Sequence, residues 1–240
     1  MIGWRARLGL MVPSINVNME KEFNLMAPVG VSIHYARLPV TEGILSKVKQ
    51  LEKSNLDRLR ESMPKAAIEL QHAEVDVIGS GFTAGGWILG LEGHMKLIKS
   101  IEHQVGVPIV TATIAVMEAM QKLGMRRIVV ATPYVETSNQ RGREFLKANG
   151  FDILAIETIG ELAHTVSSGR IYRFAKKLFV PEADGIFISC TDFPSLEILQ
   201  ALENDIGKPV VSSNQALMWK MLQVARVHEP MRDFGRLLEI

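Results

Sequence analysis

The sequence predicts an α/β protein with two pseudo-symmetric lobes, each a short parallel sheet flanked by helices. Three observations lead to this prediction: short apolar runs alternate with longer helix-period segments, the runs are apolar on both faces, and the second half of the chain repeats the order of the first. Strands that are apolar on both faces belong to parallel sheets covered on both sides by helices. At 240 residues, the chain is long enough for one large core or two smaller lobes.

The first half of the chain contains four apolar runs and one clear helical pattern. Apolar residues at spacings of three and four predict a helix over Leu51–Glu69. The apolar runs predict buried strands at Leu8–Val12, Val31–Leu38, Asp76–Ser80 and Val107–Val110.

The second half repeats this arrangement. A helical pattern covers Tyr172–Phe179. Four further strands are predicted at Arg127–Ala131, Phe151–Glu157, Asp184–Ile188 and Pro209–Val211.

The two halves match at three places in the same order. The matching segments are Val12-Pro13 with Thr132-Pro133, Phe82-Thr83 with Cys190-Thr191, and Ile101–Val110 with Leu202–Val211. Their offsets shrink along the chain from 120 to 108 to 101 residues (132 − 12, 190 − 82 and 211 − 110), as expected if the second copy lost loop residues. An ordered match favours duplication over the chance similarity of two βα units.

Duplication predicts where a ligand binds. Ligands of open parallel sheets lie beyond the carboxyl ends of the strands, so two facing lobes would enclose one site lined by equivalent loops. We expect a first lobe made of residues 1–115 plus 213–240 and a second lobe made of residues 116–212, with the active site between them.

Composition and charge exclude several classes of partner. A net charge of +1 gives no bulk attraction to nucleic acid or to an acidic membrane surface. One cysteine cannot form an internal disulfide, and the start of the chain has no secretory pattern, so we expect a cytoplasmic protein. The six histidines follow no metal-binding spacing, and we expect neither a metal nor another cofactor.

Four polar segments follow predicted strands and precede predicted helices. Unpaired N–H groups and a partial positive charge make a helix N-terminus a good place to bind a carboxylate or a phosphate. The segments are Pro13-Ser14-Ile15-Asn16, Gly81–Gly86, Thr132-Pro133-Tyr134 and Ser189-Cys190-Thr191-Asp192.

Cys190 is the strongest candidate for chemistry. At the start of a helix its thiol pKa would be lowered, and the group could exchange a proton with carbon or attack an electrophile. The alternative is an inert buried cysteine. Thr83 and Thr191 add hydroxyl donors. Tyr134 could donate its phenol to an oxyanion or simply be part-buried, and Asn16 could cap a helix or bind a carboxylate.

These segments together resemble the aspartate/glutamate racemase superfamily, in the branch that contains arylmalonate decarboxylase and maleate cis-trans isomerase. The resemblance covers nearly the whole chain and implies a duplicated Rossmann-like fold without metal or organic cofactor. It depends on Gly3–Ser14, Phe82-Thr83-Ala84, Thr132-Pro133-Tyr134, Ser189-Cys190-Thr191 and Phe234–Leu237.

The resemblance also implies roles for individual residues. Racemases and maleate isomerases of this superfamily place a cysteine in each lobe, but here the first-lobe position falls on Phe82. Arylmalonate decarboxylase has a single cysteine, which protonates an enediolate held by backbone amides, a threonine and a tyrosine. By this resemblance the catalytic residues are Cys190, Tyr134 and Thr83. The substrate-binding residues are Pro13, Ser14, Asn16, Phe82, Ala84, Thr191 and Asp192.

We therefore expect a cofactor-independent enzyme that forms and protonates an enediolate next to a carboxylate. The leading hypothesis is a decarboxylase with Cys190 as proton donor and a small carboxylic acid as substrate. Two alternatives stay open: an isomerase or racemase of small carboxylic acids, and a non-catalytic protein that binds carboxylates. A homo-oligomer is compatible with each of them.

Overall fold

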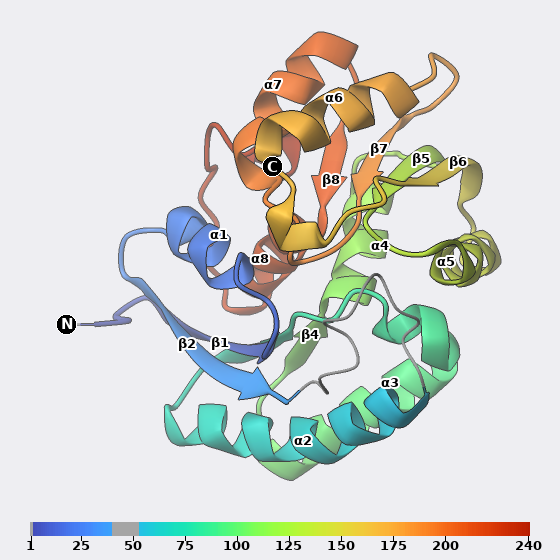
Figure 1. Cartoon of the computed structure of the whole chain (residues 1–240). Helices are drawn as coiled ribbons and strands as arrows, with labels where there is room; N and C mark the ends of the chain where they lie inside the picture. Colours follow the sequence, from blue (N-terminus) through green and yellow to red (C-terminus); the bar gives the residue numbers. More distant parts are fainter. Residues whose placement is uncertain (1, 40–52) are drawn as a thin grey trace.

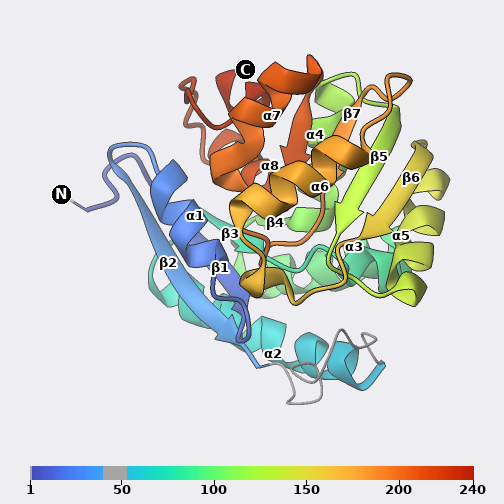
Figure 2. The same cartoon turned by 45° about the horizontal axis from the view of Figure 1, so that its top comes forward.

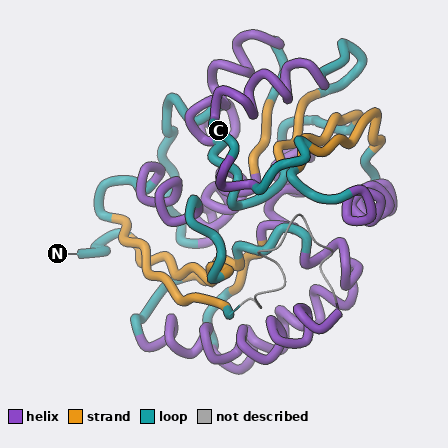
Figure 3. Tube along the Cα trace, viewed as in Figure 1, coloured by secondary structure: helices purple, strands orange, loops and turns teal. Residues whose placement is uncertain are grey.

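The computed structural model describes residues 2–39 and 53–240. Two four-stranded parallel sheets make up the two lobes, which lie one above the other in Figure 1. Helices surround the strands of each sheet (Figure 3). The α/β class and the two-lobed architecture predicted from the sequence are confirmed.

The first sheet has the strand order β2-β1-β3-β4. The predicted helix over Leu51–Glu69 corresponds to α2, and its first two residues lie outside the described part of the chain. The elements are β1 (Ala6–Pro13), α1 (Met19–Met26), β2 (Val31–Leu38), α2 (Lys53–His72), β3 (Val77–Ser80), α3 (Gly85–Val105) and β4 (Ile109–Thr111).

The second sheet has the order β6-β5-β7-β8, which is the order of the first sheet applied to the second set of strands. Its elements, with the connecting helix α4, are α4 (Ala112–Lys122), β5 (Arg127–Thr132), α5 (Glu136–Ala148), β6 (Asp152–Thr158), α6 (Ser168–Leu178), β7 (Gly185–Ile188), α7 (Leu199–Ile206), β8 (Val210–Ser212) and α8 (Ser213–Val224). The 3₁₀ turns are η2 (Ala163–Thr165), η3 (Leu196–Ile198) and η4 (Arg236–Glu239).

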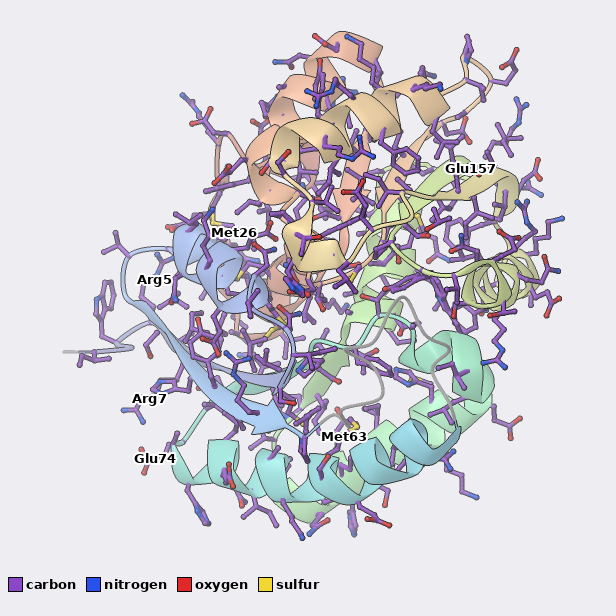
Figure 4. The ribbon with its side chains drawn as sticks, in the orientation of Figure 1. Arg5, Arg7, Met26, Met63, Glu74 and Glu157 are labelled. Atoms are coloured by element: carbon purple, nitrogen blue, oxygen red, sulfur yellow. The ribbon has the colours of Figure 1, made fainter. Side chains whose placement is uncertain are left out.

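The duplication extends to individual hydrogen bonds at the start of each central strand pair. The Asp76 carboxylate accepts a hydrogen bond from Arg7 N at 2.7 Å, and the matching Asp184 carboxylate accepts one from Arg127 N at 2.6 Å. Arg7 also forms a 2.8 Å ion pair with Glu74 at the outer edge of the first lobe, where both are labelled in Figure 4.

A second matching pair joins the helix before the last strand of each sheet to that strand. Glu102 Oε1 accepts a hydrogen bond from Ile109 N at 2.6 Å, and Glu203 Oε1 accepts one from Val210 N at 2.8 Å. Both glutamates stand in the segments that the sequence comparison aligned. A glutamate near the end of the helix thus fixes the start of the following strand in both lobes.

Two helices join the lobes. α4 and α8 pack against each other, and α8 also packs against β3 and β4 of the first sheet (Figures 1 and 2). We retain as a proposal the division into residues 1–115 plus 213–240 and residues 116–212. The packing of α8 against the first sheet supports this division. The C-terminal segment also contacts the other lobe, because Arg236 N donates a hydrogen bond to Glu203 at 2.8 Å.

No helix in the described ranges is long and apolar enough to cross a membrane.

The predicted helix over Tyr172–Phe179 begins four residues earlier than expected, at Ser168 (172 − 168 = 4). Ser168 and Gly169 have weak helix propensity and hide the first turn from a periodicity argument. Buried Ile171 and Ala175 hold this helix against the second lobe.

The fold predicts opposite effects for the same substitution at different glycines. Gly106 and Gly207 end α3 and α7 with φ of 67° and 71°, and no atom lies within 4 Å of an added Cβ. Gly106→Ala and Gly207→Ala should each lower the free energy of unfolding by about 1–2 kcal/mol, because alanine resists the left-handed conformation. Gly169→Ala, inside α6, should raise it by about 0.5–1 kcal/mol. Urea denaturation measures all three, and a loss of stability in the Gly169 variant would contradict the explanation.

Candidate active site

The loops at the carboxyl ends of both sheets meet between the lobes. The Thr191 hydroxyl, after β7, donates a hydrogen bond to the carbonyl of Gly81, after β3, at 2.8 Å. The same hydroxyl accepts a hydrogen bond from Asn16 Nδ2, after β1, at 2.9 Å. Three of the four segments singled out in the sequence therefore contact one another across the lobe boundary.

The fourth segment joins them through Tyr134. The side chains of Tyr134 and Cys190 interact, so the phenol and the thiol share one site. The Tyr134 ring also meets the ring of Trp87 edge-on, with centroids 5.4 Å apart and planes at 87°. This aromatic contact positions the phenol from the first-lobe side, since Trp87 belongs to α3.

Cys190 has a strained backbone. Its φ is 119°, a value that residues other than glycine rarely adopt. The Cys190 N–H donates to Ser213 Oγ at 3.1 Å, and the thiol sulfur accepts a contact from Asp192 N at 3.4 Å. Such strain costs about 1–3 kcal/mol and persists only where surrounding contacts enforce it, which is common at functional sites.

The expectation of a lowered thiol pKa is wrong. Burial, and after it the nearby Asp192 carboxylate, raise the pKa of Cys190 to about 12, although a hydrogen bond from the Tyr134 hydroxyl acts in the opposite direction. No helix begins at Cys190: the chain makes a turn, and the next helical residues start at Leu196. The thiol is therefore protonated at neutral pH.

Tyr134 is also neutral. Burial and the adjacent Cys190 raise the pKa of its phenol well above its usual range. A neutral phenol and a neutral thiol can both donate a proton or a hydrogen bond to an anion placed between them.

The two equivalent threonines differ in what their hydroxyls do. Their carbonyls are held alike: Thr83 O accepts from Thr113 Oγ1 at 2.7 Å, and Thr191 O accepts from Asn214 Nδ2 at 2.8 Å. The Thr191 hydroxyl is engaged on both sides, whereas the buried Thr83 Oγ1 has no hydrogen-bond partner in the described chain. Buried hydroxyls without a partner are rare in proteins, so Thr83 is suited to meet a ligand. Ala84, next to it, is buried at the start of α3.

Phe82 occupies the place that Cys190 has in the other lobe. Its ring lies over Gly85, where an added Cβ would come within 2.9 Å of it. His94 is buried nearby, with its Cε1 3.7 Å from the same Cβ position at Gly85. Burial lowers the pKa of His94 to about 4, and its Nε2 lies 2.9 Å from Thr111 Oγ1. The first lobe thus has an aromatic ring where the second lobe has a thiol.

Asp192 links the thiol to the rim of the site. Its carboxylate accepts a hydrogen bond from Val17 N at 3.0 Å and pairs with His164 Nδ1 at 3.2 Å. Sequence reasoning missed His164 because η2 carries it from a separate loop, with no motif around it. Ser213, Asn214, Asn18 and Glu22 were missed for the same reason: only the fold brings them to Cys190–Leu196.

The remaining predicted residues lie at the end of β1. Pro13 is buried and is the last residue of the strand, and Ser14 is exposed, with its N–H bonded to Leu38 O at 2.8 Å. Their roles toward a substrate stay predictions. Within residues 2–39 and 53–240, no group of three or more His, Cys, Asp or Glu side chains is arranged to hold a metal ion.

Fold and candidate site together define a class of two-lobed α/β proteins in which the strand-end loops of two equivalent sheets meet. The sequence model of the arylmalonate decarboxylase family matches residues 8–238. The chain belongs to this family, as the resemblance in its motifs predicted.

Individual relatives are distant. A maleate isomerase of Geobacillus stearothermophilus is 24% identical over 97% of this chain and 96% of the relative. An arylmalonate decarboxylase of Bordetella bronchiseptica is 27% identical over 76% of this chain and 79% of the relative. A solved structure of a Nocardia farcinica maleate cis-trans isomerase variant with a covalently bound succinylcysteine intermediate has a TM-score of 0.88 at 21% identity, covering 98% of both chains.

The groups around the Cys190 thiol predict opposite shifts of its pKa in two variants. Asp192→Asn removes the carboxylate that raises the pKa of Cys190, so the pKa should fall and alkylation by iodoacetamide at pH 9 should become faster. Tyr134→Phe removes a hydrogen bond that lowers this pKa, so alkylation should become slower. Each unit of pKa corresponds to about tenfold in thiolate population. Cys190 is the only cysteine, so mass spectrometry follows it alone; shifts of the same sign in both variants would refute this account.

Proposed function

We propose that this chain is a cofactor-independent decarboxylase of substituted malonates, in which Cys190 protonates the enediolate left by the loss of carbon dioxide. One observation carries the proposal: the site holds a single thiol whose pKa is raised to about 12. A protonated thiol is an acid and a poor nucleophile. Decarboxylation needs an acid after carbon–carbon cleavage and no base before it.

The proposed reaction has two steps. The carbon–carbon bond to one carboxylate breaks, carbon dioxide leaves, and the electron pair passes into the remaining carboxylate as an enediolate. The Cys190 S–H then gives its proton to the α-carbon, which yields a monocarboxylic acid and a thiolate. The thiolate recovers a proton from solvent water, so the cycle closes without a cofactor.

We assign stabilisation of the enediolate to hydrogen-bond donors and partial charges that can contact its oxygens. Thr83 Oγ1 is buried without a partner, Tyr134 is a neutral donor, and the first turn of α3 adds partial positive charge. Preorganised donors of this kind are often the largest catalytic contribution. Asn16 and Thr191 are hydrogen-bonded to each other, and we propose that they hold the loops around the substrate in place. Further substrate contacts are proposed for Pro13, Ser14, Phe82, Ala84 and Asp192.

The site also suggests the class of substrate and the compartment. We propose a small carboxylic acid as the substrate, because neutral donors and the N-terminus of α3 lie at the site. An active free thiol fits a reducing compartment, and we propose the cytoplasm.

Turnover of phenylmalonate tests the proposal. Cys190→Ser should abolish measurable decarboxylation, because a serine hydroxyl is a far weaker acid. Thr83→Val should lower kcat by about 10²–10³, the usual cost of losing one oxyanion donor. Thr158→Val, at the end of β6, is the matched control and should keep at least half of the activity. Equal turnover in the wild type and the Cys190 variant would sink the proposal.

A single acid on one face also predicts the stereochemistry. With methylphenylmalonate, the product should be one enantiomer, because the opposite lobe presents Phe82 in place of a second thiol. Chiral chromatography measures the enantiomeric ratio. Incubating the purified product with the enzyme should leave that ratio unchanged, since inversion at the α-carbon requires a base on one face and an acid on the other.

An isomerase or racemase of small carboxylic acids is the second candidate. It is favoured by the match to a maleate isomerase over 97% of the chain and by His94, a neutral imidazole that lies with Phe82 beside Gly85. Conversion of maleate to fumarate, or deuterium exchange at the α-carbon of 2-phenylpropionate in heavy water, would support it over the decarboxylase. Binding of these acids without any turnover would point to a non-catalytic carboxylate-binding protein.

A further inference from the structure

The loop that carries Cys190 is held from the opposite lobe. Asn16 bonds to the Thr191 hydroxyl at 2.9 Å, and Asn18 Nδ2 donates to Phe193 O at 2.9 Å. Glu22 Oε1 then accepts hydrogen bonds from two successive backbone N–H groups in this loop, those of Ser195 at 2.8 Å and Leu196 at 3.0 Å. We call Asn16, Asn18 and Glu22 the loop clamp. All three lie in or just before α1, which faces the second lobe in Figures 1 and 2.

Glu22 is the central member of the loop clamp. Its side chain is buried, with 2% of the residue exposed, and it forms no ion pair within the part of the chain that the structure describes. Its second oxygen, Oε2, accepts a hydrogen bond from Asn214 Nδ2 at 2.6 Å. The same Asn214 nitrogen donates to the carbonyl of Thr191 at 2.8 Å. Two hydrogen bonds therefore connect Glu22 to the residue that follows Cys190.

We propose that Glu22 is a positioning residue for Cys190, acting by fixing the orientation of the Asn214 amide. A carboxylate accepts at both oxygens, so it holds the two backbone N–H groups and the Asn214 NH₂ at once. The NH₂ is then directed at Thr191 O and holds the turn in which Cys190 has its strained φ of 119°. The catalytic part of this inference rests on the proposed function, whereas the structural part does not.

An amide at position 22 cannot replace the carboxylate. With its oxygen kept on the two backbone N–H groups, its NH₂ would face the Asn214 NH₂, and two donors would meet. Rotating the Asn214 amide would relieve this clash but would place its oxygen against the Thr191 carbonyl. Either arrangement breaks one link between Glu22 and the thiol loop, and leaves a buried polar group without a partner.

The duplication shows that this device serves the thiol side alone. Glu22 is the fourth residue of α1, and the fourth residue of α5, the equivalent helix, is Asn139. The Asn139 side chain has no carboxylate, and its Oδ1 accepts a hydrogen bond from Thr132 Oγ1 at 2.7 Å within its own lobe. The loop that carries Phe82 therefore has no counterpart of the Glu22 carboxylate, although the backbone scaffold of the two lobes is otherwise equivalent.

Glu22→Gln tests the proposal, with Glu203→Gln as matched control. Glu203 is equally buried and its carboxylate also accepts two backbone N–H bonds, from Val210 and Arg236, each at 2.8 Å. Val210 begins β8, so this carboxylate lies at the opposite end of the sheet from the site. Both variants should lose stability in urea denaturation, but only Glu22→Gln should change the reactivity of the Cys190 thiol.

The first readout is the thiol itself, followed by iodoacetamide alkylation of the sole cysteine as a function of pH in folded protein. Loosening the turn admits water and reduces the burial that raises the pKa of Cys190. Glu22→Gln should therefore accelerate alkylation at pH 8 by about tenfold, a fall of one pKa unit, while Glu203→Gln should change it less than twofold. Equal acceleration in both variants, or none in Glu22→Gln, would overturn the proposal.

The second readout is turnover of phenylmalonate. Glu22→Gln should lower kcat at least about tenfold with a change of less than threefold in KM, as expected for a misplaced acid with intact binding. Glu203→Gln should keep kcat within twofold. If the wild type turns over no malonate, the proposed function fails, and the alkylation contrast still decides whether Glu22 positions the thiol. If Glu22→Gln does not fold, Asn18→Ala takes its place and should show the same pair of changes at smaller size.

Discussion

The candidate site depends on the contact between the two lobes where their strands end, and the hydrogen bond from the Thr191 hydroxyl to the carbonyl of Gly81 lies at its centre. Each lobe alone would present a row of strand-end loops to solvent. Together they bury the Thr191 side chain, and Asn16 completes its hydrogen bonding from the first lobe. The burial that keeps the Cys190 thiol protonated follows from the same closure, so the chemistry of the site is a property of the lobe interface.

Most of the fold follows from the sequence, because its signals are local and repeated. Apolar runs locate all eight strands within a few residues, and the aligned Asp76 and Asp184 make the same backbone hydrogen bond in both lobes. The charge state of Cys190 does not follow, since it depends on burial and on how the chain turns after β7. A strand followed by polar residues looks the same in sequence whether a helix or a turn comes next. Glu22 was invisible for a related reason: 173 residues separate it from the loop it holds (195 − 22).

The two lobes share a scaffold and differ in their chemistry. Cys190 faces Ser213, whose hydroxyl accepts its N–H, and the residue equivalent to Ser213 behind Phe82 is Ala112 (213 − 101 = 112). The Thr83 hydroxyl, which has no hydrogen-bond partner in the described chain, lies on the side without a thiol. The proposed proton donor and this hydroxyl thus come from different lobes, and a substrate that uses both must contact both. Divergence after duplication has turned a symmetric enclosure into a site with two unlike faces.

This asymmetry also explains why a part-buried, protonated thiol suits the proposed reaction better than an activated one. When the pKa of a thiol is about 12, its thiolate is closer in basicity to an enediolate than an ordinary thiolate is. Such a thiol keeps its proton until a strong base forms beside it. A nucleophilic role would require the opposite arrangement, with a cation or a helix N-terminus beside the sulfur. Here the adjacent charged group is the Asp192 carboxylate, which disfavours a second negative charge. The strain of the Cys190 turn is offset by contacts that the other lobe makes with the same loop.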